Sequence, residues 1–228
     1  FAMIAAVVTG VLPPEKAFSG FSQGFMLLIL SAMLVAKGII KSGLGQRIAF
    51  LFIRRFGHST LRLGYCIVAT DTILGPAIPS NTARSGVLYP ISLALSIDTG
   101  SRADDGTRNR TGRYLMMVSI ASLTISSALW FTAMAANPVG AKIAEDFGVY
   151  MNFGNWLLVS SVPSLAALIA VPYLLYRFFP PEARRTPEAP EMAAAELEKM
   201  GPVSRDEWIT GLTFLSMIVL WALAGALG

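Results

Sequence analysis

Cysteine, histidine and charged residues are scarce in this sequence. Among 228 residues there is one cysteine, Cys66, which excludes an internal disulfide, and one histidine, His58, which leaves no cluster with the spacing of metal ligands. Aspartate, glutamate, lysine and arginine account for only 14% of the residues, whereas 54% are hydrophobic and the mean hydropathy is +0.59. These values lie outside the range of soluble domains and disfavour metalloenzyme chemistry.

Long apolar windows are abundant instead. Windows of about 18 to 25 largely uncharged residues recur along the chain, and a helix of that length crosses the hydrocarbon core of a bilayer. We therefore predict an all-α, polytopic integral membrane protein surrounded by the lipid bilayer. The chain opens without methionine on "FAMIAAVVTGVL" and stops within another apolar window, so we expect it to be part of a longer protein.

The distribution of lysine and arginine predicts a topology, because cytoplasmic loops are enriched in these residues. One path through the bilayer places most of the 18 basic residues on the cytoplasmic side. The net charge of +4 is then explained by membrane orientation rather than by binding to nucleic acid.

The segment "GLGQRIAFLFIRRFG" has the pattern of an interfacial amphipathic helix. Arg47, Arg54 and Arg55 are expected on one helical face, and the opposite face is apolar. We predict that this helix lies along the inner membrane surface, with an ordinary loop helix as the alternative.

A polar cluster, "PAIPSNTARSG", lies inside the apolar stretch 63–97 and interrupts it at residues 76–82. Both flanks of this stretch are basic, so both are predicted to be cytoplasmic. Each limb of roughly 15 residues reaches about 22 Å as a helix, which is too short for a full crossing. We therefore predict a re-entrant helical hairpin with the polar cluster at its tip.

Breaks at membrane depth are tolerated where protein or water covers them, and transporters use them to place helix ends at a substrate site. Ser80 is suited to cap the second limb, with Asn81 and Thr82 in its first turn, so that the positive helix end faces an anion. The interruption "TAMAANPVG" predicts a broken transmembrane helix, with Asn137 as cap and Pro138 as the first helical residue. A packed kink at each break is the alternative.

At these residues the sequence resembles the divalent anion/sodium symporter (DASS) family, in particular its citrate/succinate and 2-oxoglutarate/malate exchanger branch. "SNTAR" after a proline, followed by "GVLYPI", resembles the family's hairpin-tip motif, and "KSGLGQRIA" and "TAMAANP" match neighbouring blocks. The resemblance covers essentially the whole chain. It implies two inverted repeats that each bring one Ser-Asn-Thr motif to a shared site. Only the first motif is present, so the resemblance implies the N-terminal half of a transporter that works with its C-terminal half and as a homodimer moving like an elevator.

The resemblance also implies roles for individual residues. Ser80, Asn81 and Thr82 would be the first motif and would bind substrate carboxylates. Asn137, in the unwound segment 132–137 beside them, would also bind substrate.

Na⁺ is the only coupling ion that the resemblance implies, and no other metal or cofactor is expected. Ser80 and Asn81 of the motif, together with Thr132 and Ala133 of the unwound segment, would hold it. In sodium-coupled members a hydroxyl one turn before the motif helps to hold the ion. Pro76 stands at that place here, which argues against the first sodium site.

Asp71 and Arg84 are ionisable residues within the predicted hairpin. Such residues are costly in a membrane and usually face the protein interior, where they pair or line a substrate path. One interpretation is a structural ion pair that braces the two limbs. The other is that Arg84 supplies fixed positive charge beside the substrate, in place of a bound sodium ion.

Five parts are predicted along the chain. They are scaffold-type transmembrane helices with the interfacial helix (1–57), a transport-type unit (58–150) with the hairpin 63–97 and the broken helix 113–150, a transmembrane helix (155–177), a cytoplasmic linker (178–206) and the start of a second repeat (207–228).

These observations together predict a secondary active transporter in a membrane, of the bacterial inner-membrane type, and not an enzyme. It would move small di- or tricarboxylate anions by alternating access, with exchange slightly favoured. Sodium-coupled symport of dicarboxylate or sulfate is the alternative mechanism. A structural membrane fragment and a membrane enzyme are the alternatives from other classes of protein.

Overall fold

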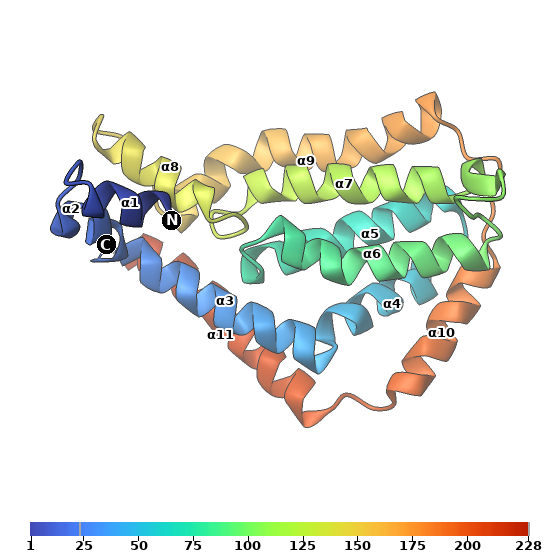
Figure 1. Ribbon diagram of the computed structural model, residues 1–228. Helices are drawn as coiled ribbons and strands as arrows, with labels where there is room; N and C mark the ends of the chain where they lie inside the picture. The colour runs from blue at the N-terminus through green and yellow to red at the C-terminus, as the bar shows by residue number, and fades with distance from the viewer. Residues whose placement is uncertain (23, 228) are drawn as a thin grey trace.

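The computed structural model describes residues 1–22 and 24–227, and the regular structure in these residues is helical, without a β-strand (Figure 1). This confirms the predicted all-α class. Positions 23 and 228, which fall in the predicted parts 1–57 and 207–228, lie outside the described residues. The α-helices are α1 (Ala2–Val8), α2 (Pro14–Phe18), α3 (Gly24–Ser42), α4 (Leu44–Phe56), α5 (Thr60–Leu74), α6 (Asn81–Asp98), α7 (Gly112–Leu129), α8 (Ala136–Glu145), α9 (Phe153–Phe178), α10 (Glu188–Met200) and α11 (Arg205–Leu227).

Several helices have the length and composition of membrane spans. Within the described residues, the segments Gly112–Leu129, Phe153–Phe178 and Arg205–Leu223 are each long and apolar enough to cross a bilayer. Pro14–Ser22 and Met26–Ser42 give a fourth span if they count as one bent pair. Only 17% of the α9 window is buried within the protein, so most of its apolar surface faces outward, as a lipid-facing helix requires.

Helices α5 and α6 form the hairpin that the sequence predicts as re-entrant. They contain 15 and 18 residues and are joined through a short 3₁₀ turn, Gly75–Ala77, and an extended segment. Both limbs run from the basic end of the bundle, on the right of Figure 1, to a tip near its centre. The re-entrant course stays a prediction, because helix lengths alone do not fix where the bilayer lies.

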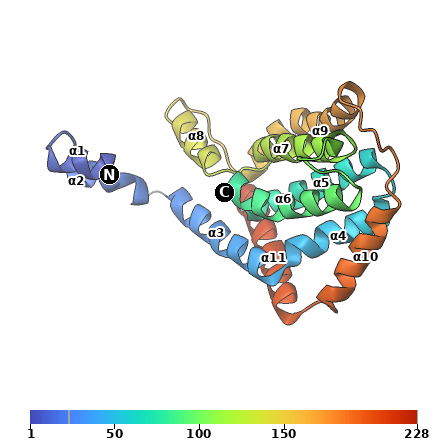
Figure 2. The ribbon, with the colours of Figure 1, turned by 45° about the vertical axis from the view of Figure 1, so that its right-hand side comes forward.

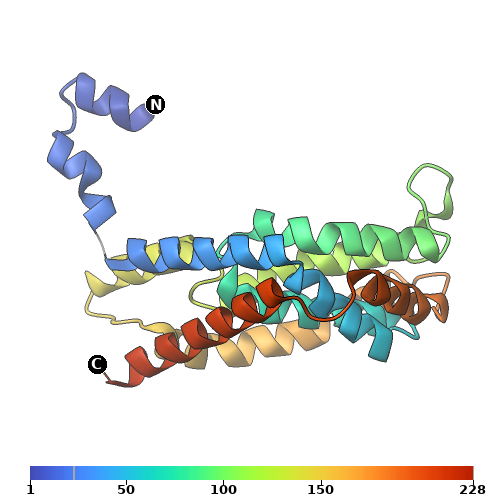
Figure 3. The ribbon, with the colours of Figure 1, turned by 90° about the horizontal axis from the view of Figure 1, so that it is seen from below.

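The hairpin belongs to a bundle with α7 at its centre. Helix α7 contacts α5, α6 and α9 along their lengths. A second layer consists of two pairs: α3 lies beside α11 (Figure 1), and α4 lies beside α10 (Figure 3). Figure 2 shows the two pairs meeting at an angle below the bundle, and α1 and α2 lying away from it.

The pair α4 and α10, called the arm below, connects the α3/α11 pair to the bundle. Helix α4 leads from α3 to α5, and α10 leads from the segment after α9 to α11. Left-handed glycines lie at both connections to the α3/α11 pair: Gly43, with φ of +79°, precedes α4, and Gly201, with φ of +67°, follows α10. A residue with a Cβ is strained in this conformation, so both sharp turns favour glycine.

One residue of the arm departs from its predicted position. Arg54 and Arg55 are exposed as expected, but Arg47 is buried, with 8% of its surface accessible. The connection between α10 and α11 covers the first turn of α4, where the Arg47 guanidinium donates to both carboxylate oxygens of Glu207, with an Nε–Oε1 distance of 2.5 Å. The prediction of a shared exposed arginine face is therefore wrong at Arg47, because a segment distant in sequence covers that face.

Glu207 has a second role at the start of α11. Its Oε2 accepts from the Ser204 backbone N–H at 2.8 Å, while the Ser204 hydroxyl accepts from the Glu207 backbone N–H at 3.1 Å. This reciprocal arrangement is a capping box, which satisfies two N–H groups at a helix start. The same carboxylate thus begins α11 and binds the arm.

Candidate functional site

The hairpin tip is an irregular but covered piece of backbone. Residues 75–79 are buried, so their polar groups are shielded from lipid, as a break at membrane depth requires. Ser80 has extended backbone angles, and its hydroxyl accepts from the Ala83 backbone N–H at 3.3 Å, which confirms it as the N-cap of α6. Asn81 is half-buried and Thr82 is exposed in the first turn. The motif therefore begins a helix at the boundary between covered and open surface.

The break between α7 and α8 lies directly against this tip. The Thr132 hydroxyl donates to the Pro76 carbonyl oxygen at 2.8 Å, and the Trp130 indole N–H donates to the Thr72 carbonyl oxygen at the same distance. A Cβ on Gly75 would lie 2.7 Å from Cδ1 of Trp130, so this approach needs glycine. The two predicted breaks are thus packed together, with Thr132 beside the tip.

Asn137 does not cap α8 as predicted. Helix α8 begins at Ala136 after an N-cap, Ala135, that makes no side-chain capping bond. The Asn137 amide nitrogen instead donates to the carbonyl oxygens of Ser127 and Trp130, at 2.8 and 3.1 Å. The last carbonyl groups of a helix have no hydrogen-bond partner inside the helix. Asn137 supplies donors to such carbonyl groups at the end of α7. Both hydrogens of the Asn137 amide group are used in these bonds. Only the amide oxygen remains, and because an oxygen acceptor cannot donate to an anion, Asn137 is not suited to bind one.

A buried ion pair lies behind the tip. Asp71 on α5 and Arg84 on α6 have no accessible side-chain surface, and Nη1 of Arg84 lies 3.0 Å from Oδ1 of Asp71. The other carboxylate oxygen of Asp71 accepts from the hydroxyls of Ser122 and Ser126 on α7, at 2.8 and 2.6 Å. The pair therefore joins both limbs of the hairpin to α7.

The same guanidinium reaches Asn81 of the Ser-Asn-Thr motif. Nη2 of Arg84 donates to Oδ1 of Asn81 and to the Ser127 hydroxyl, each at 2.7 Å, and Ser127 lies 2.5 Å from the same Asn81 oxygen. An arginine side chain has only donors, so the Asn81 atom that faces it has to be the oxygen. The Asn81 NH₂ group is consequently turned away from Arg84.

A cavity of about 390 Å³ opens beside the tip, between α6 and α3. Ser80 and Ala83 line it on the hairpin side, and Lys37 and Lys41 line it on the α3 side. The rest of the lining is apolar and comes from Met33, Ala36, Ile40, Ile78 and Pro79, so this cavity is a largely hydrophobic recess between α3 and the hairpin tip.

Comparison with known proteins identifies the class to which this arrangement belongs. Residues 1–228 match the family model described as "Sodium:sulfate symporter transmembrane region". The chain belongs to this family. The predicted family relationship is thereby confirmed, and the family is one of membrane transporters.

Its relatives include carboxylate transporters. The chain is 42% identical over 226 residues to "Dicarboxylate transporter 1, chloroplastic" of Spinacia oleracea, which covers 98% of this chain and 40% of the relative. It is 40% identical over 228 residues to YflS of Bacillus subtilis, covering 99% of this chain and 48% of the relative. It is also 35% identical over 212 residues to the "L-tartrate/succinate antiporter" of Escherichia coli. This match covers 92% of this chain and 43% of the relative. The chain thus spans less than half the length of these relatives.

Three members of the buried network were not singled out from the sequence: Ser122, Ser126 and Ser127. A signal for the first two exists, because Ser119, Ser122 and Ser126 follow one another at intervals of three and four residues on a single face of α7. A row of hydroxyls on one face of an apolar helix indicates a polar partner in the protein interior. Here that partner is Asp71 on the hairpin.

Proposed function

We propose that this chain contributes one of two binding motifs of a secondary active transporter for small di- or tricarboxylates of the malate, succinate, 2-oxoglutarate and citrate type. The observation that carries the proposal is the orientation of Asn81. Its oxygen accepts from Arg84 at 2.7 Å, so its NH₂ group is available to a carboxylate at the N-terminus of α6. Relatives named for dicarboxylate and for tartrate/succinate transport support the same substrate class.

Substrate donors in this proposal are the Asn81 amide, the Thr82 hydroxyl and the backbone N–H groups of the first turn of α6. Ser80 shapes this turn through its cap, and Arg84 acts through Asn81. The transporter works by alternating access as a homodimer, with a second motif supplied by another part of the whole protein.

Exchange of one carboxylate for another is the proposed mode of transport. Moving a dianion against a membrane potential of 100 mV costs about 2.3 kcal/mol per charge, whereas exchange of equal charges avoids this cost. A sodium ion at the motif would need the Asn81 oxygen, but that oxygen already accepts from the Arg84 guanidinium. Arg84 thus takes one position that Na⁺ would otherwise fill. Sodium-coupled symport of dicarboxylate or sulfate is the alternative, and the family description names sodium and sulfate.

The test uses the full-length protein in liposomes. Vesicles preloaded with unlabelled dicarboxylate are expected to take up labelled malate or succinate when choline replaces sodium, and empty vesicles are not. Sodium-dependent uptake into empty vesicles would establish symport instead.

Asn81→Ala tests the binding site itself. Loss of a hydrogen bond to a charged group corresponds to about 1.5–3 kcal/mol, so the apparent affinity for carboxylate is expected to fall at least about tenfold. The matched control is Asn155→Ala, which makes the same truncation at an exposed position of α9 and should leave transport unchanged. Wild-type uptake by correctly folded Asn81→Ala would refute the site.

A further inference from the structure

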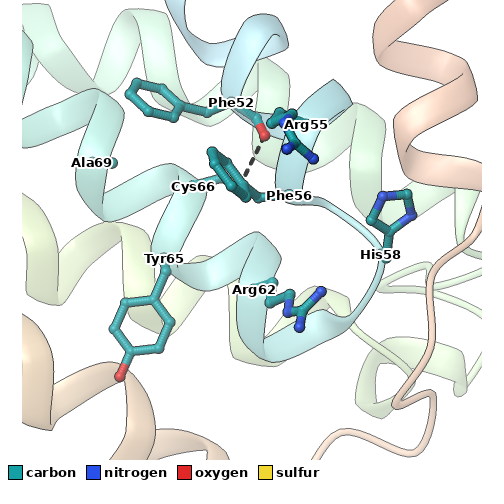
Figure 4. A pocket seen from close by; sticks show the side chains of 8 residues that line it. All are labelled: Phe52, Arg55, Phe56, His58, Arg62, Tyr65, Cys66 and Ala69. Carbon is teal, nitrogen blue, oxygen red and sulfur yellow. Dashed lines mark hydrogen bonds between the residues drawn. The ribbon is translucent and has the colours of Figure 1, made fainter.

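A second cavity lies away from the hairpin tip, between the arm helix α4 and the start of α5. Its volume is about 600 Å³, within the range of about 300–1,000 Å³ that is typical of ligand sites. It is lined by Phe52, Arg55, Phe56, His58, Arg62, Tyr65, Cys66 and Ala69. Figure 4 shows these side chains arranged around the opening between the two helices and the turn that joins them.

Polar groups gather at one end of this cavity. Arg55, His58 and Arg62 come from the end of α4, the connecting turn and the first turn of α5 (Figure 4). Arg55 and Arg62 are exposed, and neither forms an ion pair with another described residue. The Arg55 guanidinium lies 5.5 Å from the centre of the Phe56 ring, a cation–π distance that holds it at the rim. Two arginines without an acidic partner, beside a histidine, favour an anionic group at this end of the cavity.

The opposite end of the cavity is apolar. Phe52 and Ala69 lie there, whereas the Tyr65 ring extends toward α9, where its hydroxyl donates to the Ile169 carbonyl oxygen at 2.7 Å. The Cys66 thiol is likewise directed to the Phe52 carbonyl oxygen, at 3.5 Å. A ligand that fills the whole cavity therefore needs an anionic head and a hydrocarbon portion.

We propose that this cavity binds an anionic glycerophospholipid, with its phosphate at Arg55 and Arg62 and the start of its acyl chains along Phe52 and Ala69. Helix α4 has the composition of an interfacial helix, and basic pockets between membrane helices at the interface bind anionic headgroups. The cavity also lies where the arm joins the hairpin, so the bound lipid contacts both elements. A soluble phosphate compound would contact only the polar end of the cavity. A lipid would contact both ends and is therefore the better ligand.

Binding can be measured with detergent-solubilised full-length protein and phosphatidylglycerol that carries a fluorescent label on one acyl chain. Unlabelled phosphatidylglycerol is expected to compete at least about tenfold better than phosphatidylcholine. Glycerol 3-phosphate at the same concentrations is expected not to compete. Equal competition by phosphatidylcholine would overturn the headgroup assignment, and effective competition by glycerol 3-phosphate would make this a site for soluble anions.

Two matched double variants locate the site. Arg55→Gln with Arg62→Gln is expected to weaken binding about 30-fold, the factor that corresponds to about 1 kcal/mol for each arginine near an anionic group. Arg54→Gln with Arg177→Gln removes the same charge from exposed arginines outside the cavity and should change binding less than about twofold. An equal loss in both variants would show attraction by overall charge and refute a specific site.

A variant that keeps every charge provides an independent test. Ala69→Trp fills the apolar end of the cavity and is expected to weaken lipid binding at least about fivefold, while size-exclusion chromatography verifies the fold. Unchanged binding in a folded Ala69→Trp protein would refute the placement of the acyl chains.

Discussion

Replacing Asp71 and Arg84 singly and together tests whether the buried ion pair holds the hairpin to α7. Asp71→Asn leaves the Arg84 charge buried without a counter-ion, and Arg84→Gln leaves the Asp71 charge in the same state. Both side chains are fully buried, with 3.0 Å between Nη1 and Oδ1, so solvent cannot compensate for the missing partner. Each single variant is therefore expected to lower the free energy of unfolding by about 3–5 kcal/mol.

The double variant has no charge at this site, and Asn retains the shape of Asp, whereas Gln is shorter than Arg. It is expected to be more stable than either single variant, because the large cost in each single variant comes from the unpaired charge. The coupling free energy from this cycle is expected to be about 3 kcal/mol, at the upper end of the range for residues in one buried network.

Chemical unfolding of the full-length protein in detergent gives the four free energies. The control cycle uses Lys142 and Glu145, whose ion pair is shorter, at 2.7 Å, but exposed, with 44% and 39% of the two side chains accessible. Its coupling free energy is expected to be at most about 0.5 kcal/mol. Additive effects of Asp71→Asn and Arg84→Gln would refute the argument that this pair is energetically coupled.

Two further predictions concern the course and the packing of the hairpin. In a Cys66→Ser background, single cysteines at Arg55 and Arg108 are both expected to react with an impermeant reagent from the cytoplasmic side only, and labelling on opposite sides would exclude a re-entrant hairpin. Gly75→Ala is expected to destabilise the protein by about 1–3 kcal/mol, because its methyl group overlaps Trp130, and wild-type stability in an unfolding experiment would contradict that close approach.

The helical class followed from the sequence because lipid imposes a strong local constraint. Each apolar window has to satisfy its own backbone hydrogen bonds, so composition alone predicts helices near the observed positions of α3, α9 and α11. The pairing of α4 with α10 was not predictable in this way. It depends on contacts between residues more than a hundred positions apart, including the burial of Arg47 by the segment that carries Glu207.

At the candidate site, too, local interactions were predictable from the sequence and interactions between distant residues were not. The Ser80 cap was predictable, because its partner, the Ala83 N–H, is three residues away. Asn137 was assigned to the wrong helix end, because the nearby carbonyls at the end of α7 compete for its amide hydrogens. The orientation of Asn81 could be derived only from the structure, since it follows from the position of the Arg84 donor.

The two left-handed glycines have a mechanical consequence. Gly43 and Gly201 form the joints at which two helices packed side by side, α4 and α10, meet a second such pair, α3 and α11. Because α4 and α10 are packed together, they cannot reorient independently. A displacement of the hairpin bundle relative to α3 and α11 therefore has to change the backbone conformation at Gly43 and Gly201 together. Arg47 follows the first joint by four residues and donates to the Gly201 carbonyl oxygen of the second at 3.0 Å. One side chain therefore connects the two hinges of this linkage.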